Sequence, residues 1–98
     1  MKITKNLQGN HLDISLDGRV DTMTAPELEA ELQKDLDAIE TLTIDFGSVA
    51  YISSAGLRVL LSAHKAMAKK GGLKITNCNE IVREVFDVTG FADILTIE

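Results

Sequence analysis

Two adjacent serines, Ser53 and Ser54, are the side chains best placed in this sequence to do chemistry. They follow the apolar pair Tyr51-Ile52 and precede the small residues Ala55 and Gly56, where a helix is expected to begin. A serine at a helix N-terminus caps the helix and contributes about 1 kcal/mol. The same place suits a phosphate, because unpaired N–H groups and the positive end of the helix dipole face it. From the residues alone both interpretations stay open, and the two serines can divide the roles.

Serine catalysis needs a base within hydrogen-bond reach, and no base is expected near these hydroxyls. His11 begins a strand at the far end of the fold, and His64 lies about three helical turns beyond Ser54. The chain has neither the glycine-rich loops that cradle nucleotides nor the nucleophile elbow of hydrolases. Cys78 stands alone and is expected as a half-buried apolar residue, so no metal site is supported. We therefore expect no enzymatic activity and no cofactor.

Two acidic residues flank the segments that should lie near the serines. Asp21 is expected in a turn or capping role beside Thr22. Alternatively, it orients the Ser54 hydroxyl or helps to place a metal–nucleotide complex brought by a kinase. The same choice applies to Asp45, and the structural role is favoured for both.

Alternating apolar and polar residues predict the strands that position this site. Segments 3–7 and 11–16 form an antiparallel hairpin around the Gln8-Gly9-Asn10 turn. Segment 41–46 alternates in the same way, and a shorter strand is expected at 73–76. One buried face in each of three strands indicates a sheet that helices cover mainly on one side.

Three helices are predicted between and after the later strands. The first begins at a capping box, Thr24-Ala25-Pro26-Glu27, and its apolar spacing continues to Ile39. The second covers 55–70, and the third is capped by Asn79 and ends at Gly90. A short turn and strand are expected in the apolar tail.

The order of these elements predicts one α/β domain over residues 1–98. Its sheet is mixed, with an antiparallel first hairpin followed by parallel βα units with right-handed crossovers. In such folds, the ends of parallel strands and the starts of the following helices share one edge. We expect the loops 21–23 and 47–54 to meet there, with the second loop held on the core by Tyr51 and Ile52.

Composition narrows the classes of partner. The 98 residues are 45% hydrophobic and 26% charged, and the formal net charge is −5. An acidic chain with few aromatic residues is a poor nucleic-acid binder. No apolar stretch has the length of a membrane span, and a single cysteine suits a reducing compartment, so we expect a cytoplasmic protein. No large exposed apolar stripe is evident, so we expect a monomer. The basic cluster Lys65, Lys69 and Lys70 is expected to suit a helix C-terminus.

The run from Asp45 to Leu57, DFGSVAYISSAGL, resembles the strand–loop–helix signature of the STAS domain family. Within that family the chain is most similar to the single-domain bacterial anti-sigma factor antagonists. The run GRVD at 18–21 resembles the family's second motif, and Gly71-Gly72 before a strand also fits. The resemblance covers nearly the whole chain. It implies that Ser54 is the phosphorylation site, with Ser53, where members often carry an acid, as the alternative acceptor.

What the resemblance implies is partner switching. The unphosphorylated protein would bind an anti-sigma factor that is also a serine kinase and so free a sigma factor, and phosphorylation would release it. A serine phosphatase would reset the cycle. The alternatives are a constitutive STAS adaptor subunit of a larger complex, such as a sensor assembly or lipid transporter, and a small-ligand binding module. The expected partner-binding residues are Asp21, Thr22, Tyr51, Ser53, Ser54, Ala55, Gly56 and Leu57.

Overall fold

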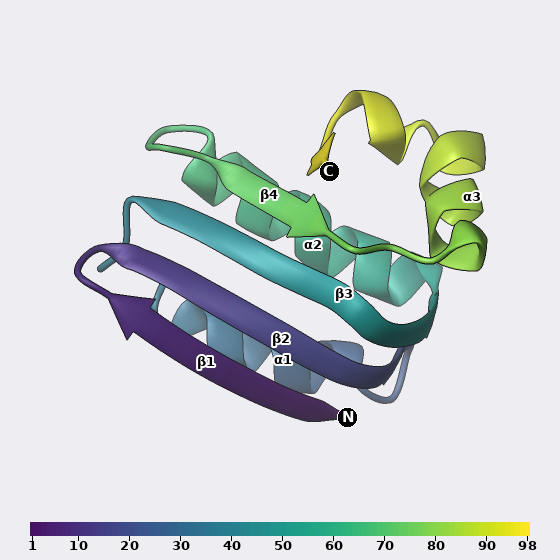
Figure 1. The fold of residues 1–98 in the computed structure, drawn as a ribbon, viewed down its shortest axis with the longest axis horizontal. Helices are drawn as coiled ribbons and strands as arrows, with labels where there is room; N and C mark the ends of the chain where they lie inside the picture. The colour runs from purple at the N-terminus through teal and green to yellow at the C-terminus, as the bar shows by residue number, and fades with distance from the viewer.

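A computed structural model describes residues 1–98 as a five-stranded sheet with three α-helices (Figure 1). The strands are β1 (Lys2–Gln8), β2 (His11–Val20), β3 (Thr41–Ile52), β4 (Leu73–Thr76) and β5 (Thr96–Ile97). The helices are α1 (Ala25–Gln33), α2 (Ser54–Met67) and α3 (Glu80–Thr89), followed by the 3₁₀ turn η1 (Phe91–Asp93). None of the helices combines the length and apolarity needed to cross a bilayer.

The strands lie side by side in the order in which they occur in the chain. Strands β1 and β2 form the predicted antiparallel hairpin, and every later pair is parallel. Because parallel neighbours need a crossover, a helix connects β2 to β3, β3 to β4 and β4 to β5. The prediction of a mixed sheet is confirmed.

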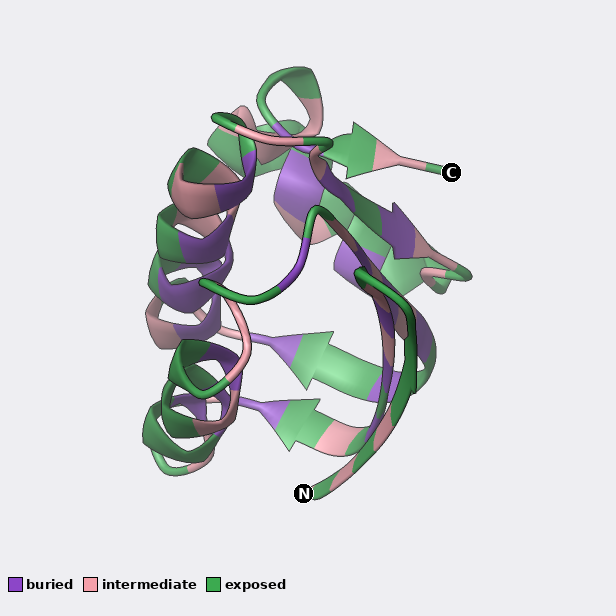
Figure 2. Ribbon diagram, turned by 90° about the vertical axis from the view of Figure 1, so that its left-hand side faces the viewer, coloured by how far each residue is buried: buried purple, intermediate pink, exposed green.

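The core lies between the sheet and the helices on one of its faces (Figure 2). Leu12 and Ile14 of β2 and Leu42 and Ile44 of β3 are buried, whereas the residues between them are not. At one end of the sheet, Phe46 packs against Phe86 of α3 with ring centroids 6.1 Å apart. Aromatic burial of this kind makes the largest single contributions to such a core, so it fixes α3 against β3.

The prediction of a loop over 47–54 is wrong, because β3 continues to Ile52. Gly18 of β2 pairs with this segment after one register shift, and Arg19 and Val20 pair with it after a second. At each shift two successive residues of β3 face outward, which hides the alternation in the sequence. Ile52 is fully buried as expected, so the serines follow a strand end rather than a loop.

Helix α1 begins after Thr24 as predicted, but it lacks the predicted capping bond and ends earlier than predicted. It ends at Gln33, and the apolar Ile39 reaches the core from the turns that follow. Thr24 is the N-cap residue, but its backbone is already helical, so its side chain makes no capping hydrogen bond. Its hydroxyl instead donates to the Arg19 carbonyl oxygen at 2.7 Å. The predicted capping box is therefore absent.

The remaining helix boundaries agree with the sequence to within a few residues. Helix α2 begins one residue earlier than predicted and ends three residues earlier, at Met67. Asn79 caps α3 by accepting from the Val82 N–H at 2.8 Å, and Gly90 ends it with φ 81°. That left-handed conformation favours glycine.

Candidate functional site

The candidate site lies at the edge of the sheet where β2 and β3 end and α2 begins. Val20 pairs with Ile52 as the last residues of the two strands. The Ser53 N–H donates to the Val20 carbonyl oxygen at 2.8 Å, which extends the pairing by one residue. The turn after β2 and the start of α2 are therefore held at the same edge, as the sequence predicts.

The hydroxyl groups of the two serines differ in their exposure to solvent. Ser53 is the N-cap residue of α2 with extended backbone, φ −100° and ψ 177°. Its Oγ is buried and has no hydrogen-bond partner, so the capping bond expected of a serine is not made. Ser54 is the first helical residue, and it is exposed. Only the Ser54 hydroxyl is therefore open to an incoming enzyme.

Gly56 lets the start of α2 approach the two strand ends closely. A Cβ at this position would lie 2.7 Å from Val20 Cγ1 and 2.8 Å from Ile52 Cγ1. Both of these side chains are fully buried and have no room to move. The glycine thus sets how closely the first turn of α2, which carries Ser54, packs against the ends of β2 and β3. The buried Leu57 holds the same turn on the core.

Asp21 organises the turn after β2. Its carboxylate accepts from the N–H groups of Met23 at 3.0 Å and Thr24 at 3.2 Å, and Arg19 Nε lies 3.8 Å away. Partial desolvation raises the pKa of this carboxyl, but the hydrogen bonds and the nearby guanidinium together hold it below its usual range. The turn role is confirmed, and no hydrogen bond joins Asp21 to Ser54.

Tyr51 is 40% exposed rather than packed into the core. The guanidinium of Arg19 lies 5.9 Å from the centroid of its ring, a cation–π distance. In the turn after β2, Thr22 and Met23 are exposed, and Met23 at 85% is the most exposed large apolar side chain. Met23 and Arg19 lie in segments that the sequence singled out, the loop 21–23 and the run 18–21, but neither was among the expected partner-binding residues.

A shallow hollow of about 220 Å³ separates the starts of α1 and α2, one residue from Ser54. Its lining residues are Thr22, Ala25, Pro26, Glu29, Ala55, Arg58 and Val59. Arg58 and Glu29 carry opposite charges there, yet they do not form an ion pair. The sequence analysis also missed Arg58, whose place one helical turn after Ser54 was readable from the spacing.

The remaining titratable candidates have structural partners far from the serines. Asp45 accepts from the Gly47 N–H at 2.7 Å and from Asn77 Nδ2 at 3.2 Å. His11 Nδ1 lies 2.6 Å from Thr41 Oγ1. Cys78 is half-buried as predicted, and burial raises the pKa of its thiol. No group of three or more His, Cys, Asp or Glu side chains is arranged to hold a metal ion.

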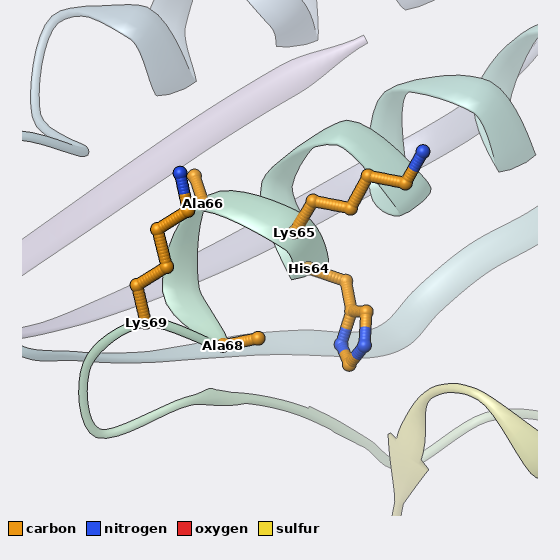
Figure 3. Close-up of a pocket in the computed structure, with 5 residues that line it drawn as sticks. All are labelled: His64, Lys65, Ala66, Ala68 and Lys69. Atoms are coloured by element: carbon orange, nitrogen blue, oxygen red, sulfur yellow. The ribbon is translucent and has the colours of Figure 1, made fainter.

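The basic cluster lies at the opposite end of α2. An open hollow of about 680 Å³ is lined there by His64, Lys65 and Lys69 with two alanines, and the lysines point away from one another (Figure 3). Lys70 instead donates to the carbonyl oxygens of Leu36 at 2.6 Å and Ile39 at 2.9 Å. Only Lys65 therefore lies in the last turn of α2, as expected, whereas Lys70 binds the turns after α1, and the lysines do not converge on a ligand.

Comparison with known proteins decides the family. The family model described as "Mlab, STAS domain" matches residues 3–96. The chain belongs to the STAS domain family. It is 38% identical to BtrV of Bordetella bronchiseptica, described as a candidate anti-sigma factor antagonist, over 99% of this chain and 85% of that protein. It is 34% identical to the anti-sigma-B factor antagonist of Bacillus subtilis, over 90% and 82% of the two chains.

Solved structures agree with this STAS fold. The anti-sigma factor antagonist SpoIIAA in its unphosphorylated form matches 99% of this chain and 88% of its own, with a TM-score of 0.84 at 18% identity. The phosphorylated form of the Bacillus SpoIIAA matches 99% and 91%, with a TM-score of 0.76 at 17% identity. The mixed sheet and the three helices are therefore those of the family.

Proposed function

We propose that this STAS protein is an anti-sigma factor antagonist that works by partner switching at Ser54. The observation that carries the proposal is the pair of serines at the start of α2, of which only Ser54 is exposed. The names of the two relatives at 38% and 34% identity support the same function. In its unmodified form the protein binds an anti-sigma factor that is also a serine kinase, and a sigma factor is freed.

The modification needs no catalytic group of this chain. The kinase transfers the γ-phosphoryl group of ATP to Ser54 Oγ, the hydroxyl proton leaves to a base of the kinase, and ADP is released. A serine phosphatase later hydrolyses the phosphoester to restore the hydroxyl and release inorganic phosphate. The protein is thus the substrate of two enzymes and is not itself an enzyme.

The added charge explains how binding is lost. A phosphate brings about −1.5 to −2 charges to a chain whose formal net charge is −5. Opposite an acidic or apolar patch of the partner, repulsion and desolvation both oppose association. A loss of about 3 kcal/mol weakens binding more than a hundredfold, which is enough to exchange partners.

The partner-facing surface surrounds Ser54. It comprises Asp21, Thr22, Tyr51 and Ala55, which sequence reasoning selected, together with the exposed Met23. The other selected residues position it: Gly56 and Leu57 are buried, and Ser53 has a buried hydroxyl. We further propose that the protein acts as a monomer in the cytoplasm, where a sigma factor and its antagonists meet.

The test is incubation with the cognate kinase and ATP, followed by mass spectrometry of the intact protein and its peptides. We expect one phosphate on Ser54, no labelling of Ser54→Ala, and normal labelling of the control Ser53→Ala. Unchanged labelling of Ser54→Ala would contradict the assignment. If no kinase encoded beside this gene labels the protein, the constitutive adaptor becomes the better account.

A further inference from the structure

Arg58 is the one basic side chain beside Ser54 that the fold leaves unengaged. It is exposed on α2 and makes no ion pair or side-chain hydrogen bond within the chain. The other arginine at this edge, Arg19, is already held between the Asp21 carboxylate and the Tyr51 ring. The guanidinium is therefore free to bind a phosphate that is added to the Ser54 hydroxyl.

The spacing brings Arg58 to the same face of α2 as Ser54. Residues four apart on a helix are neighbours, and an acid placed four residues before a base is the favourable orientation. Phosphoserine at the first helical position is such an acid, and its three oxygens match the fork of a guanidinium. Helix α2 runs without interruption from Ser54 to Met67, so its backbone holds the two residues in this relation.

The surroundings leave room for the pair. Arg58 lines the hollow of about 220 Å³ between α1 and α2, and Ala55, directly after Ser54, lines it too. Besides Arg58, the one charged residue that lines this space is Glu29 of α1, because the Asp21 carboxylate binds the N–H groups of its own turn. Glu29 makes no ion pair with Arg58, so its singly charged carboxylate is the one weaker competitor of a doubly charged phosphate for the Arg58 guanidinium.

We propose that Arg58 is a built-in receptor for the phosphate on Ser54. Unmodified, the edge presents the free cation of Arg58 to a partner. Once Ser54 carries a phosphate, Arg58 turns to it, and the local charge changes from +1 to between about −0.5 and −1. The switch then acts in two ways at once, because it adds an anion and withdraws a cation. This inference rests on the proposed modification of Ser54.

The experiment uses the full chain with phosphoserine incorporated at position 54 during translation, so that no kinase is needed. The second pKa of the phosphate is measured by ³¹P NMR titration at low ionic strength. A paired guanidinium stabilises the dianion, so Arg58→Ala should raise that pKa by about 0.2 to 0.4 pH unit. The difference should shrink in 1 M salt, where charges are screened.

Two further variants make the result specific. Arg58→Lys keeps the positive charge and should keep at least half of the difference. The matched control Arg83→Ala removes an exposed arginine from α3 and should leave the phosphate unchanged. Equal pKa values in the parent and Arg58→Ala, or an equal change in Arg83→Ala, would overturn the proposal. Because the phosphate is installed directly, that outcome would leave open whether a kinase modifies Ser54.

Discussion

At the scale of single residues, the site depends on two neighbours of the same type in different environments. From residue chemistry alone either Ser53 or Ser54 could cap a helix or accept a phosphate, and only the family resemblance favoured Ser54. Their difference arises from one backbone pairing, in which the Ser53 N–H continues the ladder to Val20 and its Oγ turns inward. Residue chemistry could locate the pair but not divide its roles, because burial of a hydroxyl is decided by tertiary packing.

Gly56 allows the close packing of the start of α2 on the strand ends, and its replacement tests that role. In Gly56→Ala the new methyl group would overlap two buried branched side chains and lie 3.1 Å from the Val20 carbonyl oxygen. We expect a loss of about 1–3 kcal/mol in the free energy of unfolding, despite the better helix propensity of alanine. Denaturant unfolding measures it, with the exposed Ser62→Ala of the same helix as the control. Wild-type stability in Gly56→Ala would refute the close-packing argument.

At the scale of elements, regular patterns predicted well and irregular ones did not. The hairpin, the parallel order and the one-sided helix layer followed from alternation and turn chemistry. The second half of β3 was missed because its register shifts break the alternation at Gly47-Ser48 and Ala50-Tyr51. Helix α1 was predicted too long because Ile39 keeps the helical spacing by chance and is buried from a turn.

The Asn79 side chain makes one hydrogen bond to α3 and one to β3, and two substitutions test these bonds. Its Oδ1 caps α3, and its Nδ2 donates to the Val49 carbonyl oxygen of β3 at 3.0 Å. Asn79→Ala should lose about 1–2 kcal/mol of unfolding free energy, whereas Asn79→Asp keeps the cap and should lose less. Thermal and denaturant unfolding measure both variants. An Asn79→Ala protein as stable as wild type would contradict a stabilising role for these two bonds and leave the apolar contacts of α3, such as Phe46–Phe86, to hold it.

At the scale of the whole molecule, the proposed partner-binding surface is one edge of the sheet, and the rest of the chain forms the core that supports it. The core of 23 buried residues lies behind the sheet and contains no buried polar or charged residue. A phosphate on exposed Ser54 therefore changes the surface charge without disturbing the packing. The protein can then alternate between two binding states on one rigid fold, which is what partner switching requires.

The most direct test of that claim is the affinity for the cognate anti-sigma factor, measured by calorimetry with unmodified protein and with protein that carries phosphoserine at position 54. We expect the modified form to bind more than a hundredfold more weakly, while both forms show the same unfolding midpoint. Equal affinity of the two forms would contradict switching at Ser54.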